Sequence, residues 1–421
     1  MNQGLWNIPE SWALSRIDRV ATVSARIGWK ALTASEYQPV GYAFLATPNI
    51  KSKEIDFENV NYISEFRYEE SPNLKLAVDD VLLAKDGNTL GICNIVRDLP
   101  REATVNGSIA VIRTSEVEAN FLRYVLSSSL VQDHIDSVKD GMGVPHLFQR
   151  DIKRIPVPLP SIEEQRLIAD FLDFEVDRIE HLLVARRRQV ELLTLRRERV
   201  VEQNLLLGGS CEIDRMIPLK YLVDRVSVGI VITPAAWYVE NSGVPALRGV
   251  NIRPGGIVLN DMVHISNEGH ALHQKSRLSS GDLVVVRTGQ AGVAAVVPDE
   301  LDGANCIDLV IIKTGGKINS SYLEYMLNSE YARRRVNEYS VGSIQSHFNV
   351  SAMKSMPVPV LDLEQQMRVV EELDRNVGVI NELKGGVLRQ IKLLEERKRA
   401  LITAAVTGQI DVATARGADL S

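Results

Sequence analysis

The sequence repeats itself at a spacing of about 200 residues, and this duplication limits the possible folds more than any other feature. The segment IPVPLPSIEEQR at 155–166 aligns with MPVPVLDLEQQM at 356–367, an offset of 356 − 155 = 201. Further pairs keep this offset: Gly141 with Gly342, His146 with His347, and Lys153 with Lys354. A period of this length exceeds that of solenoid repeats, so the pattern predicts a tandem duplication of a whole domain together with the segment that follows it.

The first part of each repeat has the pattern of a mixed α/β module. Short β-branched runs alternate with glycine-containing turns at 79–96 and 281–297, which predicts a strand, a tight turn and a second strand. An amphipathic helix is expected at 121–138 and again at 322–338, followed by a glycine-containing loop and a proline-punctuated strand. We therefore predict two related α/β modules with polar hairpin tips.

The second part of each repeat predicts a long helix. Residues 161–207 and 362–407 contain no proline, and Ser161 and Asp362 stand where N-caps are expected. Apolar residues recur three and four positions apart over more than four heptads in both repeats, which is typical of helices that pack on each other as a coiled coil. The predicted seam consists of Leu172, Ile179, Val190 and Leu193 in the first helix and Leu373, Ile380, Ile391 and Leu394 in the second.

The alternative is that each helix lies only on its own module. A helix of about 46 residues is roughly 70 Å long, and a module of about 160 residues cannot cover that length. We therefore expect the two helices to pack on each other.

Charge does not by itself indicate a nucleic-acid binder. The formal net charge is -6 and the pI is about 5.8, whereas the simplest DNA-binding domains are basic. Basic residues nevertheless cluster locally, at 186–188, 196–197, 333–335 and 397–399. The simpler interpretation of any single cluster is a solvated helix face.

Composition also excludes several classes of protein. Apolar runs such as 283–286 and 291–297 are far shorter than the roughly 20 residues that cross a bilayer, and the N-terminus lacks the pattern of a secretory signal, so we expect a cytoplasmic protein. Cys93, Cys211 and Cys306 are far apart and odd in number. They predict small core residues rather than a disulfide framework or a zinc site.

Enzymatic motifs are missing from the sequence. A DNA methyltransferase would need a GxGxxG-like cofactor loop and an N/D-P-P-Y/F tetrapeptide, and neither occurs. The Pro298-Asp299 pair has no D/E-x-K partner of the kind that nucleases use, and there is no P-loop. We therefore expect a non-catalytic chain with no catalytic residues, cofactor or metal site.

One family combines these features. Its P-x-P-x(4)-E-Q signature matches Pro156, Pro158, Glu164 and Gln165 in the first repeat, and Pro357, Pro359, Glu364 or Gln365, and Gln366 in the second. Over essentially its whole length the chain resembles the specificity subunit of type I restriction-modification systems, which serve prokaryotic defence. The resemblance implies that the α/β modules are target recognition domains and that the helices are spacers paired antiparallel. It also implies three partners: double-stranded DNA, methyltransferase subunits, usually two, and a restriction (translocase-nuclease) subunit.

The expected fold class is α+β, with two α/β target recognition domains in a tandem pseudo-twofold repeat, separated by two long helices that form an antiparallel coiled coil. The predicted boundaries are 1–157 for the first recognition domain, 158–210 for the first helix, 211–358 for the second domain, and 359–421 for the second helix and tail. Two modules spaced by rigid helices suit a two-part DNA site, with one domain per half-site. Because the modules differ in sequence, that site need not be palindromic.

Candidate DNA contacts lie at the hairpin tips, in the glycine-containing loops, and just before the proline-punctuated strands. They combine cations that seek phosphates with side chains that can contact base edges. They are Lys85, Asn88, Gly141, His146 and Lys153 in the first repeat and Arg287, Thr288, Gln290, Ser343, Gln345, His347 and Lys354 in the second. The competing interpretation of each tip is an ordinary polar turn. The alternative function is a coiled-coil scaffold whose two modules bind proteins and not DNA.

Overall fold

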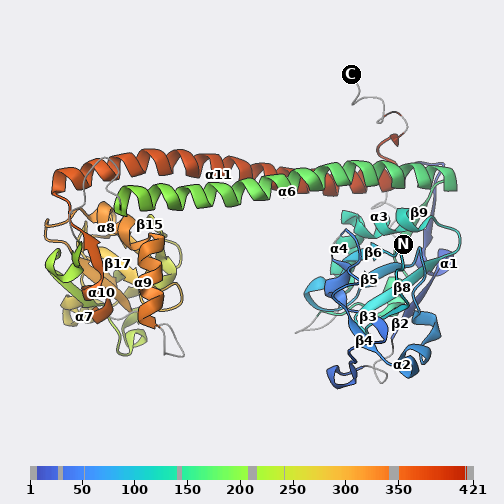
Figure 1. Ribbon diagram of the computed structural model, residues 1–421, viewed down its shortest axis with the longest axis horizontal. Coiled ribbons are helices and arrows are strands. Elements are labelled where there is room, and N and C mark those ends of the chain that lie inside the picture. Colours follow the sequence, from blue (N-terminus) through green and yellow to red (C-terminus); the bar gives the residue numbers. More distant parts are fainter. Residues whose placement is uncertain are drawn as a thin grey trace. The chain divides into compact units, whose positions relative to one another are not determined.

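The computed structural model describes residues 7–26, 32–51, 53–139, 145–206, 216–240, 242–340, 350–412 and 414. The chain forms two compact units, of which the first comprises 1–187 and 389–421 and the second comprises 188–388 (Figure 1). Each unit contains one α/β module and a part of both long helices. Within the described ranges, no helix is both long enough and apolar enough to span a membrane.

The first module is built on two sheets. Its elements before the long helix are β1 (Ala13–Arg16), α1 (Ile17–Val20), β2 (Ala21–Ala25), β3 (Tyr42–Leu45), β4 (Asn61–Ile63), α2 (Glu65–Glu69), β5 (Val81–Ala84), β6 (Cys93–Ile95), β7 (Ala103–Val105), β8 (Ile109–Thr114), α3 (Ala119–Ser127), α4 (Ser129–Val138), α5 (Gln149–Ile152) and β9 (Pro156–Leu159). An antiparallel sheet has the order β2-β8-β5-β6, and a second sheet has the order β4-β3-β7 with β3 and β7 parallel.

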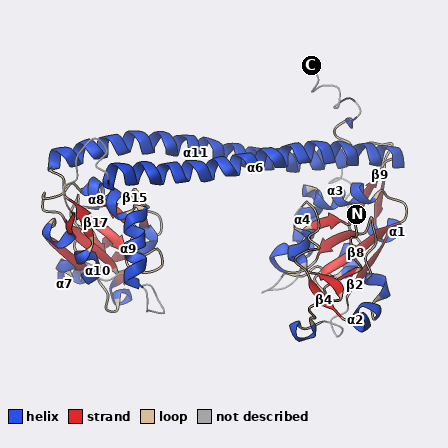
Figure 2. Ribbon diagram, viewed as in Figure 1, coloured by secondary structure: helices blue, strands red, loops and turns tan. Residues whose placement is uncertain are grey.

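Strand β5 shows why the run VLLA forms a central strand. Its side chains alternate between two cores, because Val81 and Leu83 pack with α3 while Leu82 and Ala84 pack with the second sheet. All four residues are buried, so both faces of the strand are apolar. The core of the first module therefore has two layers, one on each face of this sheet. Figure 2 shows the strands and helices of both modules.

The second module repeats this plan. Its elements are β10 (Met216–Pro218), β11 (Arg225–Val228), β12 (Tyr238–Val239), β13 (Val244–Leu247), β14 (Ile252–Arg253), β15 (Gly256–Ile257), β16 (Val263–Ile265), α7 (Asn267–Leu272), β17 (Leu283–Val286), β18 (Ala294–Val296), β19 (Asn305–Cys306), β20 (Leu309–Lys313), α8 (Ser320–Leu327), α9 (Glu330–Ser340), α10 (Val350–Ser355) and β21 (Pro357–Pro359). The main sheet has the order β11-β20-β17-β18, which matches β2-β8-β5-β6. In both modules the proline-containing strand pairs antiparallel with the module's first strand.

The amphipathic helix predicted in each module is divided in two. In the first module α3 ends at Ser127, and the Ser128 hydroxyl accepts a hydrogen bond from the Val131 N–H at 3.4 Å to begin α4. In the second module the Ser329 hydroxyl accepts from the Ala332 N–H at 3.2 Å, at the start of α9. A serine N-cap explains both breaks, because its side chain satisfies a first-turn N–H and thereby starts a new helix.

Both predicted long helices are present, as α6 (Ile162–Leu206) and α11 (Leu363–Val406). The Ser161 hydroxyl accepts from the Glu164 N–H at 3.2 Å. At the second helix the bonds are reciprocal, since the Asp362 carboxylate accepts from the Gln365 N–H at 2.7 Å and the Gln365 side chain accepts from the Asp362 N–H at 3.0 Å. Both helices therefore begin directly after the residues predicted from the sequence to be their N-caps.

Within each unit, α6 and α11 pack antiparallel. In the first unit Leu172 lies in one core with Ile402, and Lys398 Nζ lies 2.6 Å from a Glu180 carboxylate oxygen. In the second unit Leu373 shares a core with Val201 and Leu205, and the Lys384 ammonium donates to the Thr194 hydroxyl at 3.0 Å. The predicted seam residues are all buried or half-buried: Leu172, Ile179, Val190, Leu193, Leu373, Ile380, Ile391 and Leu394. The paired-helix prediction is confirmed.

The cysteine predictions can be checked at two positions. Cys306 is buried and Cys93 is half-buried, and both are free thiols. Cys211 lies outside the described residues.

Candidate nucleic-acid interface

In the first module the structure brings together two predicted contact regions. The turn that follows β5 lies against residues 145–147, where the Gly87 N–H donates to the Pro145 carbonyl and the Leu147 N–H donates to the Lys85 carbonyl, both at 2.8 Å. Asp86 and His146 form an isolated antiparallel bridge. The hairpin tip and the histidine are therefore parts of one surface, although about 60 residues separate them in the sequence.

Two side chains on this surface contact the same carboxylate, that of Asp86. His146 Nδ1 contacts Asp86 Oδ1, and Lys85 Nζ lies 3.4 Å from Asp86 Oδ2. Only 10% of the Lys85 side chain is exposed, so its ammonium is held inside the edge of the module. Asn88 is exposed, and the left-handed conformation of Gly87, with φ 67°, allows the tight turn beside it. The predicted tip therefore presents Asn88 to solvent and keeps Lys85 as a paired cation.

The equivalent tip of the second module follows β17. Arg287 is half-buried and pairs with Asp308, with 2.5 Å between Arg287 Nη1 and Asp308 Oδ1. Thr288 and Gln290 are exposed on either side of Gly289, which has φ 78°. Both tips thus place a paired cation at their base and uncharged polar side chains in solvent.

The remaining predicted contacts do not join these tips in the described structure. Gly141, Ser343, Gln345 and His347 lie outside the described residues. Lys153 is exposed, but its carbonyl accepts from the Asp18 N–H at 3.0 Å, near the start of β2, whereas the tip lies at the edge where β2 ends. Lys354 is exposed in α10, two residues before Met356, whose carbonyl accepts from the Leu219 N–H at 2.9 Å.

Two buried glutamines near the starts of α6 and α11 form hydrogen bonds with the modules, and these contacts were not among those predicted from the sequence. We call the two residues, Gln165 and Gln366, the glutamine clips. The Gln165 side chain, 2% exposed, accepts from the Glu118 N–H at 2.8 Å and donates to the Pro160 carbonyl at 3.0 Å. Gln366 makes the same two bonds, to the Asn319 N–H and the Leu361 carbonyl. The sequence did mark both positions, because both glutamines belong to the duplicated E-Q signature.

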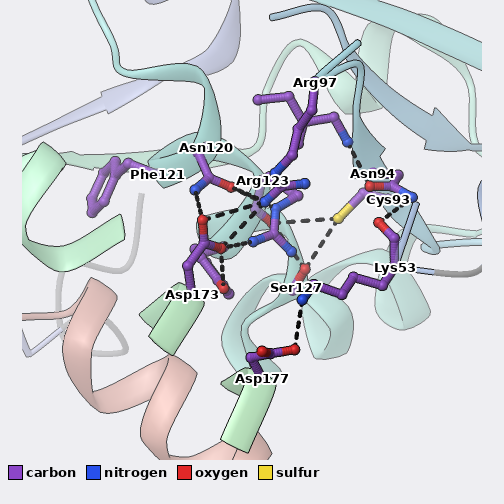
Figure 3. A network of polar contacts seen from close by, with 12 residues as sticks. Lys53, Cys93, Asn94, Arg97, Asn120, Phe121, Arg123, Ser127, Asp173 and Asp177 are labelled. Atoms are coloured by element: carbon purple, nitrogen blue, oxygen red, sulfur yellow. Dashed lines mark hydrogen bonds and ion pairs between the residues drawn. The ribbon is translucent and has the colours of Figure 1, made fainter. Parts of the chain in front are cut away.

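A polar network also joins the first module to α6. The Asp173 carboxylate accepts hydrogen bonds from Asn120 at 2.8 Å and from Arg123 at 2.9 Å (Figure 3). It also accepts one from the Tyr124 hydroxyl at 2.7 Å. One turn further along α6, Lys53 pairs with Asp177 at 2.5 Å. Burial raises the pKa of Tyr124, which keeps its hydroxyl protonated and able to donate.

In the corresponding junction of the second unit a glutamate replaces the arginine. The Tyr325 hydroxyl donates to Asp374 at 2.7 Å, as Tyr124 does to Asp173, but Glu324 occupies the position of Arg123. Burial raises the pKa of Glu324 to about 7, the N–H of Val296 partly opposes this, and the nearby Asp374 carboxylate acts in the same direction as burial. The two junctions therefore share their geometry and differ in charge.

Comparisons with known proteins agree with this architecture. Residues 9–191 match the model of the type I restriction modification DNA specificity domain. The MjaVIII specificity subunit of Methanocaldococcus jannaschii is 22% identical, over 96% of this chain and 94% of its own. The EcoKI specificity subunit of Escherichia coli is 20% identical, over 96% of this chain and 90% of its own.

Solved structures share the fold. A chain from a study of complex assembly and conformational transition of the type I restriction-modification system superposes with a TM-score of 0.75, at 18% identity, over 96% of this chain and 99% of its own. The HsdS subunit from Thermoanaerobacter tengcongensis gives a TM-score of 0.50 at 16% identity, over 97% of this chain and all of its own. Together with the duplicated modules and the paired helices, these matches agree with the resemblance seen in the sequence: residues 9–191 match the type I specificity domain, and the chain is similar over nearly its whole length to type I restriction enzyme specificity subunits.

Proposed function

We propose that this chain recognises a bipartite, asymmetric site in double-stranded DNA, with one α/β module for each half-site. The observation that carries the proposal is the pair of tips that follow the equivalent strands β5 and β17, each with a left-handed glycine and each with different exposed side chains. The first presents Asn88, and the second presents Thr288 and Gln290. Amide and hydroxyl groups of this kind form hydrogen bonds with base edges in the major groove. Different side chains at equivalent positions would recognise different half-sites.

The charged residues of the tips have a positioning role in this proposal. Lys85 and Arg287 are paired with Asp86 and Asp308, which hold these cations in place at the base of each tip, where a DNA phosphate would approach them. Phosphate contacts of this kind set the register of a protein on DNA. The exposed Lys153 and Lys354, and the loop residues Gly141, His146, Ser343, Gln345 and His347, complete the proposed set of contacts.

The long helices are the proposed docking site for two methyltransferase subunits and a restriction subunit. Large aliphatic side chains outside the seam remain exposed on these helices. They are Leu182, Val184 and Leu393 in the first unit and Leu192, Leu195, Val379, Leu383 and Leu388 in the second. So many exposed apolar residues on a pair of helices support a role for the helices in binding other proteins. Catalysis would belong to the partners, since the chain carries no methyltransferase or nuclease motif.

The test combines DNA binding with a domain exchange. The full chain with its methyltransferase subunit should bind one duplex sequence selectively and salt-sensitively. Methylome mapping should show that exchanging residues 1–157 for those of another specificity subunit changes one half of the methylated site. If both halves change together, the modules do not act separately. If no sequence-selective binding occurs, the chain is a protein scaffold. The isolated chain should transfer no methyl group from S-adenosylmethionine to DNA.

A further inference from the structure

Two adjacent β-branched residues of the second module project into solvent. Ile232 is 81% exposed and Val231 is 52% exposed, in the loop that follows β11. Burial of such side chains is normally favourable, so a loop that exposes two of them in sequence needs an explanation. We call Val231 and Ile232 the apolar knuckle.

The backbone on both sides of the apolar knuckle is anchored. Before it, the Ile230 N–H donates to the Cys306 carbonyl at 2.9 Å, and a side chain at Gly229 would collide with that carbonyl. After it, Thr233 has φ 41°, in the left-handed region that β-branched residues rarely occupy. The Thr233 carbonyl then accepts from the Ala236 N–H at 3.0 Å in a 3-10 turn. The exposed position is therefore set by the fold, at a cost in backbone strain of the kind found at functional sites.

The apolar knuckle lies at the same sheet edge as the polar tip of this module. Strands β11 and β17 both end beside the first residues of β20, where Val228 pairs with Val310 and Val286 pairs with Leu309. A direct chain of contacts also connects the two features. The Ile230 carbonyl accepts from the Asp308 N–H at 3.0 Å, and the Asp308 carboxylate holds Arg287 at the base of the tip.

We infer that the apolar knuckle contacts the C5-methyl group of a thymine in the half-site recognised by the second module. This inference rests on the proposed DNA recognition. Thymine alone among the bases presents a methyl group in the major groove, and apolar side chains recognise it there. The neighbouring Thr288 and Gln290 would form hydrogen bonds with base edges, so the edge would combine polar and apolar contacts. The apolar knuckle is thus a specificity determinant and not only a surface loop.

The experiment replaces individual thymines with deoxyuridine, which lacks only the methyl group. Binding of the full chain with its methyltransferase subunit is measured on duplexes that carry the site defined by methylome mapping. At one thymine of the second half-site, the replacement should weaken wild-type binding about fourfold, the factor expected for one buried methyl group. The Val231→Ala/Ile232→Ala variant should bind the natural site less tightly and should lose less than twofold on the same replacement.

The matched control is Val40→Ala in the first module, where another β-branched side chain is exposed to a similar extent, 80%. It should leave the fourfold effect in the second half-site unchanged. The inference is overturned if that half-site contains no thymine, if no deoxyuridine replacement in it weakens wild-type binding, or if the double variant keeps the full sensitivity. Failure of the wild-type complex to prefer any duplex would instead refute the proposed DNA recognition, and binding of a protein at the apolar knuckle would then explain its exposure.

Discussion

Replacing Glu324 by glutamine should remove a pH dependence from the stability of the second unit. Burial raises the pKa of this carboxyl to about 7, against an ordinary value of 4.5. A raised folded-state pKa means that the folded unit holds the proton more tightly than the unfolded chain. The resulting stabilisation is complete below pH 4.5 and is lost as the pH rises through about 7.

The size of the effect follows from the two pKa values. The difference between about 7 and 4.5 corresponds to an upper limit of about 3 kcal/mol, which is lost mainly between about pH 4.5 and 7. About 2 kcal/mol of this limit falls within the window from about pH 5.5 to 8. The carboxyl group is only partly buried, so solvent screening reduces the expected loss to about 1–2 kcal/mol. The groups that face Glu324 are the Val296 N–H and the Asp374 carboxylate, and Arg197 acts on the adjacent Tyr325.

Hydrogen exchange measures this loss locally. After correction for intrinsic exchange, the protection of α8 in the wild-type chain should fall about tenfold between pH 5.5 and 8. In the Glu324→Gln variant it should stay nearly constant. Helix α3 of the first unit, where Arg123 occupies the equivalent position, provides an internal control and should show no such fall. Equal pH dependence in wild type and variant would show that another group titrates and would refute the assignment to Glu324.

Three further predictions concern the clips, the helices and the tips. Gln165→Ala should lower the free energy of unfolding of the first unit by about 2–3 kcal/mol in urea denaturation, because it leaves the half-buried Glu118 N–H and the buried Pro160 carbonyl without their partner. The control Glu163→Ala, at an exposed position, should change it by under about 0.5 kcal/mol, and similar losses in both variants would refute the role of Gln165. Inserting four residues near Glu191 adds about one helical turn, roughly 6 Å, and should lengthen the nonspecific gap between the two half-sites by about one or two base pairs in methylome mapping. An unchanged gap with full activity would mean that the length of the helices does not set the spacing of the half-sites. Asp86→Asn should free the Lys85 ammonium and steepen the dependence of log K on log salt by about one in a DNA titration, and an unchanged slope would place that ammonium away from phosphate.

The sequence by itself determined the duplication, both long helices with their capping residues, and the eight residues of the apolar seam. Each of these is local or periodic information. A capping residue satisfies an N–H two or three positions away, and a seam repeats every three or four residues, so both can be recognised without knowing which segments meet. The signature glutamines were likewise identified, although the hydrogen bonds they make were not.

Only the tertiary structure decided which charged residues that are distant in the sequence form ion pairs or hydrogen bonds. Asp86 contacts His146, Arg287 pairs with Asp308, and Asp173 accepts hydrogen bonds from side chains of α3. No periodic pattern encodes such pairs, because they depend on how strands and helices are brought together by the burial of apolar side chains. The same reason applies to the apolar knuckle: Val231 and Ile232 have the composition of a buried strand in the sequence, and only the anchoring of Ile230 and Thr233 in the folded chain leaves them exposed.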